Sequence, residues 1–167
     1  MQEICGEAGI SPGALYRYFS SKSDIIAAIA EDERRETDAA LADVRRQGGF
    51  VDALCAMAER VLGQFAHEAA APIYADVFAE AARDADLALR LAEIDNLSLQ
   101  RVTDAVALAQ AHGEVDPSLN PETAARTLVA LIEGLAMRNS LTQKQPNHCA
   151  LHDFRSLATR YLAVQQS

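Results

Sequence analysis

The residues with the most evident binding chemistry lie between Ser11 and Lys22, in the segment SPGALYRYFSSK. On a helix with about 100° between successive residues, Gly13, Ala14 and Arg17 share one face. Small residues let a helix backbone approach the edges of DNA bases, and an arginine side chain binds guanine acceptors or a phosphate. We therefore expect this face to enter a groove of double-stranded DNA.

Tyr16 and Tyr18 flank that face, and Lys22 follows at the start of the next helix. Tyrosine hydroxyls and a lysine ammonium bind phosphate oxygens, which positions a protein on DNA without reading its sequence. A helix N-terminus adds amide groups that favour the same phosphate. The alternative is that Tyr16, Tyr18 and Phe19 are core aromatics.

Local signals predict two helices joined by a tight turn around this segment. Gly9 suits the positive φ of the turn, Ser11 is a favoured N-cap and Pro12 suits the first helical position. Leu15 and Phe19 share the inner face of the second helix, opposite the face expected to meet DNA.

Residues 8–19 together with Lys22 resemble the helix-turn-helix signature of TetR-family transcriptional regulators. The resemblance implies an all-helical homodimer with a small-molecule pocket, which leaves operator DNA when the effector binds. It therefore implies a ligand-responsive regulator, in most cases a repressor. The implied DNA contacts are to bases for Pro12, Gly13, Ala14 and Arg17, and to phosphates for Tyr16, Tyr18 and Lys22.

The family normally carries another helix before the first residues of this chain. The N-terminal helix is missing from this chain, and because Met1 occupies a place where the family often has an internal methionine, we expect a preceding segment that the sequence omits. The alternative is a truncated protein whose head lacks a packing partner. The remaining head sets Arg17 and Lys22 against several acidic side chains, which is a poor electrostatic footprint for DNA. A dimeric helical interaction protein that has lost DNA binding is therefore the alternative function.

Composition favours helices and argues against several classes of protein. Half of the 167 residues are apolar, and the formal net charge of −9 argues against nonspecific nucleic-acid binding by the body. Three widely spaced cysteines imply no disulfide framework and fit a cytoplasmic protein. Because no signal peptide or long apolar span is evident, no membrane partner is expected.

We divide the chain into a partial helix-turn-helix head (1–24), a connector helix (25–46) and a helical ligand-binding and dimerisation domain (47–167). Ser21 to Asp24 form a capping box that opens the connector. The expected fold class is all-α, with the head followed by a helical bundle.

Further signals mark helix ends in the body. A bend is expected at Asp84, Gly113 ends a long helix, and Asn120 followed by Pro121 begins the next.

The helix from about Pro121 to Leu141 is apolar around much of its circumference, and such a helix usually has two partners. We expect it and the last helix, from about Ala150 to Val164, to pair with their copies in a homodimer. The expected interface residues are Leu128, Ile132, Leu135, Phe154, Leu157 and Tyr161. Residues 111–135 also resemble the C-terminal domain of BetI-like family members.

A small-molecule effector is expected among the middle helices, from about Phe50 to Gln110. Binding pockets are mostly apolar with a few placed polar groups. Ordinary core packing is the alternative for each residue in this set. The expected pocket residues are Met57, Leu62, Phe65, Tyr74, Phe78 and Met137.

His148, Cys149 and His152 form a metal-like cluster with helical ligand spacing at a predicted loop–helix junction. Because no second cluster supplies further ligands, a polar turn is preferred and neither a metal nor another cofactor is expected. The sequence also has no phosphate loop, dinucleotide fingerprint or nucleophile elbow, so we do not expect an enzyme.

Overall fold

The computed structural model describes residues 5–6, 9, 11–44, 49–66, 70–142 and 147–164. Within these ranges every regular element is an α-helix, and the expected all-α class is confirmed. The helices are α2 (Pro12–Leu15), α3 (Lys22–Val44), α4 (Phe50–Gln64), α5 (Ala70–Ala81), α6 (Ala85–Ala111), α7 (Pro121–Thr142) and α8 (Asn147–Leu162).

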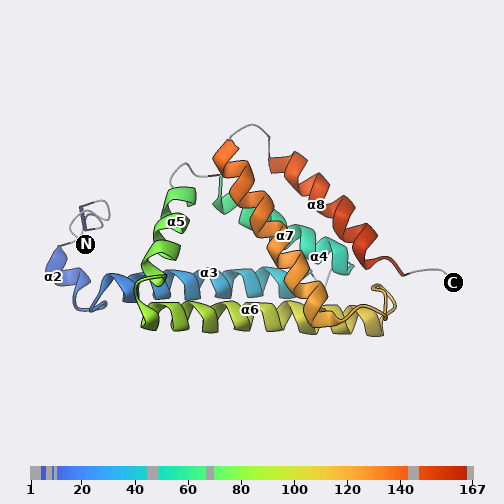
Figure 1. Ribbon diagram of the computed structural model, residues 1–167, viewed down its shortest axis with the longest axis horizontal. Coiled ribbons are helices and arrows are strands. Elements are labelled where there is room, and N and C mark those ends of the chain that lie inside the picture. The colour runs from blue at the N-terminus through green and yellow to red at the C-terminus, as the bar shows by residue number, and fades with distance from the viewer. Residues whose placement is uncertain are drawn as a thin grey trace.

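Two long helices, α3 and α6, lie side by side along the longest dimension of the molecule (Figure 1). Helix α4 contacts α3, α7 and α8, and α6 also contacts α7 and α5. The short helix α2 lies beyond the start of α3, so the head projects from one end of the body. No helix in the described ranges combines the length and apolar character needed to span a bilayer.

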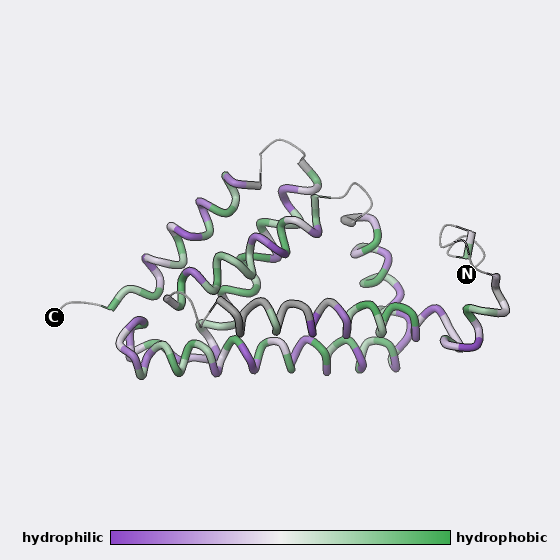
Figure 2. The backbone as a smooth tube through the Cα atoms, turned by 180° about the vertical axis from the view of Figure 1, so that it is seen from behind, coloured by the Kyte–Doolittle hydropathy of each residue, from purple (hydrophilic) through white to green (hydrophobic). Residues whose placement is uncertain are grey.

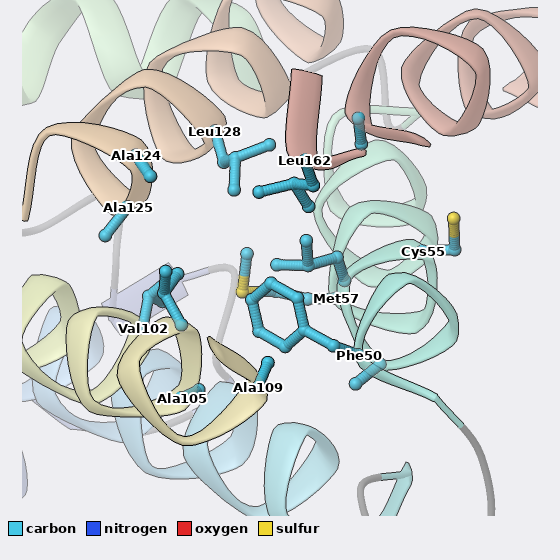
Figure 3. Packing of buried hydrophobic residues seen from close by; sticks show 14 of the residues in the cluster. Phe50, Cys55, Met57, Val102, Ala105, Ala109, Ala124, Ala125, Leu128 and Leu162 are labelled. Carbon is cyan, nitrogen blue, oxygen red and sulfur yellow. The ribbon is translucent and has the colours of Figure 1, made fainter. Parts of the chain in front are cut away.

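The main core lies where α4, α6, α7 and α8 meet. Phe50 and Met57 of α4 lie between Val102 of α6 and Leu128 of α7 (Figure 3). Burial of one such side chain contributes about 1.5–3 kcal/mol to the free energy of unfolding. Hydrophobic and hydrophilic residues recur alternately along α6, as expected for a helix with one buried face (Figure 2).

Several predicted helix ends are confirmed. The Asp24 amide donates to Ser21 Oγ at 3.1 Å, which opens α3. The Thr123 amide donates to Asn120 Oδ1 at 2.9 Å, which opens α7. Gly113, just after α6, has a φ of 74°, a conformation that glycine adopts without steric cost.

The division of the chain at 24/25 and 46/47 stays a prediction. Helix α3 begins at Lys22 and its described part ends at Val44. The second boundary lies in residues 45–48, outside the described part of the chain.

Asp84 joins the start of α6 to the start of α3. Its Oδ1 accepts hydrogen bonds from the amides of Asp86 and Leu87, both at 3.1 Å, so it is the N-cap of α6. Its Oδ2 accepts a hydrogen bond from Ser23 Oγ at 2.7 Å. The Ser23 hydroxyl, followed by the Leu87 amide, lowers the pKa of the Asp84 carboxyl.

Asp24 makes a second connection between the same two helices. Its Oδ1 accepts a hydrogen bond from Arg90 Nη1 at 2.8 Å, and its Oδ2 accepts one from the Ser20 amide at 3.1 Å. The Ser20 hydroxyl and then Arg90 hold the pKa of Asp24 well below its ordinary value. The start of α3 is thus attached to α6 at two points, both in the first turn of α3.

The N-terminus of α4 is capped by a residue from a distant loop. Gly49 is the N-cap position and offers no side-chain acceptor, but the Phe50 amide donates to Glu114 Oε2 at 2.7 Å. A Cβ placed at Gly49 would lie 3.2 Å from the same oxygen. Glycine at this position therefore lets the Glu114 carboxylate approach the first amide of α4.

Replacement of Asp84 with Asn should make the free energy of unfolding less sensitive to acid. The carboxylate has a lowered pKa in the folded chain, so its contribution is complete above the ordinary pKa of 3.8 and is lost as the pH falls toward the folded-state value. Asparagine remains a good N-cap but does not titrate. Urea unfolding between about pH 5 and pH 2 measures the difference in slope.

Asp86→Asn is the matched control, because it removes one exposed carboxylate from the first turn of the same helix. An acid dependence that is the same in Asp84→Asn as in Asp86→Asn would contradict the assigned role of Asp84.

Glu114→Ala should lower the free energy of unfolding by about 1 kcal/mol, the usual effect of removing a helix N-cap. Glu59→Ala provides the control on an exposed position of α4 and should change stability by less than about 0.5 kcal/mol. Denaturant unfolding of the two variants and the wild type gives both values. Equal stabilities for the two variants would show that Glu114 does not cap α4.

Candidate DNA-binding face and effector cluster

The head has a small core of its own that orients α2. Leu15 is buried against Cys5 and Ile25, and Phe19 packs against this group. The amides of Ala14 and Leu15 donate to the Ser11 carbonyl at 3.0 and 3.2 Å, and the Ala14 amide also lies 3.2 Å from Ser11 Oγ, so Ser11 is the N-cap of α2, as predicted. Leu15 and Phe19 both pack inward as predicted, but α2 ends at Leu15, so Phe19 follows the helix and does not share a helix face with Leu15.

Gly13 and Ala14 of α2, together with Arg17, are here called the outer face; because α2 ends at Leu15, Arg17 lies in the turn that follows and does not share a helix face with them as predicted. Gly13 and Arg17 are exposed and Ala14 is half-buried. No heavy atom lies within 4 Å of a Cβ placed on Gly13, so open space adjoins the backbone there. Gly9, in the preceding turn, has the predicted positive φ, 63°. The outer face is therefore accessible to a large partner.

Tyr16 and Tyr18 are 53% and 82% exposed, which excludes the interpretation that they are core aromatics. They follow α2 in a turn whose Tyr18 amide donates to the Leu15 carbonyl at 3.0 Å. Pro12 begins α2, and its side chain lies outside what the structure describes.

Lys22 is the first residue of α3, as the predicted phosphate contact requires, and its side chain is 47% exposed. Its ammonium lies 3.6 Å from Glu80 Oε2, in the last turn of α5. The proximity of Glu80 and Arg90 to the head has no local signal in the sequence. Asp84 was recognisable as a bend, but its bond to Ser23 spans 61 positions and leaves no local signal.

Four of the expected pocket residues gather in one place, here called the aromatic cluster. It comprises Leu62 of α4, Phe65 at the C-cap of α4, Tyr74 of α5 and Met137 of α7. The Phe65 and Tyr74 rings have centroids 4.4 Å apart and planes inclined by 32°, a tilted contact. Ala136 of α7 and Ala150 of α8 are buried in the same cluster, and Val61 and Leu151 pack against both this cluster and the main core.

The other two expected pocket residues lie elsewhere. Met57 belongs to the main core, beside Phe50 (Figure 3). Phe78 is 67% exposed, because it lies on the side of α5 that faces away from the bundle. The expectation that both line the same pocket as Tyr74 is therefore wrong.

The expected dimer interface also divides into two groups. Leu128, Ile132 and Phe154 are buried within the single chain and can offer no surface to a second copy, so this part of the expectation is wrong. The buried face of α7 packs on α6 and α4 instead. The other three residues keep solvent-accessible surface: Leu135 is half-buried, and Leu157 and Tyr161 are exposed.

His148, Cys149 and His152 lie in the first turns of α8, which begins earlier than predicted, at Asn147. In the described ranges no three His, Cys, Asp or Glu side chains are grouped closely enough to hold a metal ion.

Two domain families match the two parts of the chain. Residues 1–29 match the bacterial regulatory proteins of the tetR family, and residues 50–166 match the C-terminal domain of BetI-type transcriptional repressors. The HTH-type transcriptional regulator UidR of Escherichia coli K12 is 30% identical over 143 residues, which are 81% of this chain and 68% of UidR.

Solved structures share the fold. A TetR-family regulator from Rhodococcus sp. superposes with a TM-score of 0.76 at 24% identity, covering 96% of this chain and 86% of that one. Bacillus subtilis FadR, in complex with stearoyl-CoA, gives a TM-score of 0.81 at 15% identity, covering 97% of this chain and 88% of FadR. From the family matches and the UidR relative, this chain belongs to the TetR family of bacterial transcriptional regulators, with a C-terminal domain of the BetI repressor type.

Proposed function

We propose that the chain represses transcription by placing the outer face of its head in the major groove of an operator, and that a small molecule bound in the body releases it. The observation that carries the proposal is the outer face itself. Its glycine backbone adjoins open space, and an exposed arginine follows in the turn after α2. The match of the first 29 residues to the DNA-binding family disfavours an interaction protein that has lost this activity.

In this proposal the contacts have two kinds of chemistry. Arg17 donates to guanine acceptors, and Ala14 contacts a thymine methyl, so these residues read bases. Tyr16, Tyr18 and Lys22 bind phosphates on the groove walls and set the register of the head. Pro12 and Gly13 let the first turn of α2 approach the bases closely.

We further propose that operator binding needs a homodimer. One head with few basic side chains gives weak binding, whereas a two-fold pair addresses two half-sites of a palindrome. Leu157 and Tyr161 are one turn apart on the exposed side of α8, beside half-buried Leu135 of α7. They are the residues on which we place the subunit interface.

The proposed effector site is the aromatic cluster. It is apolar, and the Tyr74 phenol provides a polar group at its edge, as binding sites for small molecules require. FadR shows that a protein of this fold accommodates a small-molecule ligand. An effector that separates Phe65 from Tyr74 displaces α5, and release follows only if it binds the DNA-incompetent arrangement more tightly.

Arg17→Ala and Lys22→Ala should weaken DNA binding in different ways. Loss of Arg17 removes a base contact, which costs about 1–3 kcal/mol of discrimination and relaxes preference at one position of each half-site. Loss of Lys22 weakens binding to every sequence and lowers the slope of log K against log salt by about one per head. Gel shifts on the region upstream of the chain's own gene and on random duplexes, at several salt concentrations, distinguish these effects.

Arg126→Ala is the control, because this arginine is exposed on α7, far from the head in sequence and fold, and pairs with Glu122. If neither head variant differs from this control, the outer face is not the DNA-binding surface.

Leu157→Glu and Tyr161→Glu should convert the dimer to a monomer and weaken operator binding, since an added carboxylate at a buried apolar interface must lose its hydration. Leu108→Glu is the matched control, because Leu108 is an exposed leucine on α6. Sedimentation measures the masses. A dimer that withstands both α8 substitutions would place the interface elsewhere.

A further inference from the structure

The proposed phosphate-binding lysine already has an anionic partner within the chain. The Lys22 ammonium and Glu80 Oε2 are 3.6 Å apart, and the two side chains are 47% and 33% exposed. Both groups are therefore partly hydrated, and the pair can separate without leaving a buried charge. A carboxylate and a phosphate are anions that bind the same ammonium, so the two compete.

The pair involves a different helix from the other contacts at the start of α3. Ser23 and Asp24 bind Asp84 and Arg90, which belong to the start of α6. Glu80 belongs to the last turn of α5. The Glu80 carbonyl accepts hydrogen bonds from the amides of Arg83 and Asp84, both at 2.9 Å, so the end of α5 stays attached to the N-cap of α6. A tilt of α5 about this end can therefore redirect the Glu80 side chain while α3 and α6 stay joined.

Helix α5 also carries Tyr74, which stacks on Phe65 in the aromatic cluster. Tyr74 and Glu80 are fewer than two helical turns apart, a separation of about 9 Å along the axis. In Figure 1, α5 extends from the head-proximal end of α6 toward α7, with which it is also in contact. One short rigid element thus connects the aromatic cluster to the partner of Lys22.

We infer that Glu80 is a positioning residue for the Lys22–phosphate contact: its carboxylate holds the ammonium in competition with DNA, and the position of α5 sets the strength of that competition. This inference rests on the proposed function. The lysine–phosphate contact carries no base information, so Glu80 acts equally on every DNA sequence. When a DNA phosphate binds the Lys22 ammonium, the Glu80 carboxylate loses its cationic partner and is left near the negatively charged DNA.

The test compares the affinities of the full chain and its variants for a labelled random-sequence duplex and for the upstream duplex of its own gene. Glu80→Gln should bind both duplexes more tightly, by about two- to fivefold per head, the range of a partly exposed ion pair. Asp76→Asn is the matched control, because it removes one exposed carboxylate from α5, one turn before Glu80. The gain of Glu80→Gln must exceed that of this control.

A double-mutant cycle identifies the partner. In a Lys22→Gln background, Glu80→Gln should give no more gain than Asp76→Asn. Tyr74→Ala, which removes the stacked ring and loosens α5, should raise affinity for the random duplex, and this increase should disappear in the Glu80→Gln background.

Three results would overturn the inference: a Glu80→Gln affinity equal to that of Asp76→Asn, a gain that persists without Lys22, or a Tyr74→Ala effect that is independent of Glu80. In each of these cases the wild type still binds DNA and the proposed function stands. If the wild type binds neither duplex, the proposed function and the inference fail together.

Discussion

The attachment of the head to the body depends on two ionised aspartates. Asp84 divides its oxygens between the first amides of α6 and Ser23, and Asp24 divides its oxygens between Ser20 and Arg90. Hydrogen bonds to a carboxylate are stronger than those between neutral groups, and they lower the pKa of both acids, so both remain ionised at neutral pH. Because each carboxylate accepts hydrogen bonds from both helix starts, the start of α3 and the start of α6 are expected to move together.

The other helices are arranged around this connection between α3 and α6. The main core packs α4, α6, α7 and α8 into one unit, and α3 lies along α6 over its length. Helix α5 is the short element at the head-proximal end, and much of its surface is exposed. A displacement of α5 therefore disturbs few core contacts, which suits an element that we propose to respond to an effector.

Charge explains why a small number of head contacts would govern affinity. The chain has a formal net charge of −9, so its body repels DNA and contributes no general attraction. The outer face contains Arg17. Lys22, at the start of α3, is already paired with Glu80. With so few cations available, a modest change at one lysine represents a large share of the proposed DNA affinity, and a two-fold dimer applies the change at both heads.

Local physical chemistry made the helical class, several helix ends and the orientation of α2 predictable. The Ser21–Asp24 box, the Asn120 cap and the positive φ of Gly9 and Gly113 each depend on neighbours within a few residues, so the sequence alone determined them. Periodicity also identified apolar helix faces, but not the partner of each face. Only the tertiary structure decided that Leu128 and Phe154 are buried within one chain, that Phe78 faces outward, and that Glu114 caps α4. The contacts at Glu80, Asp84 and Arg90 were decided in the same way, because they join residues about sixty positions apart whose proximity results from packing of the whole bundle.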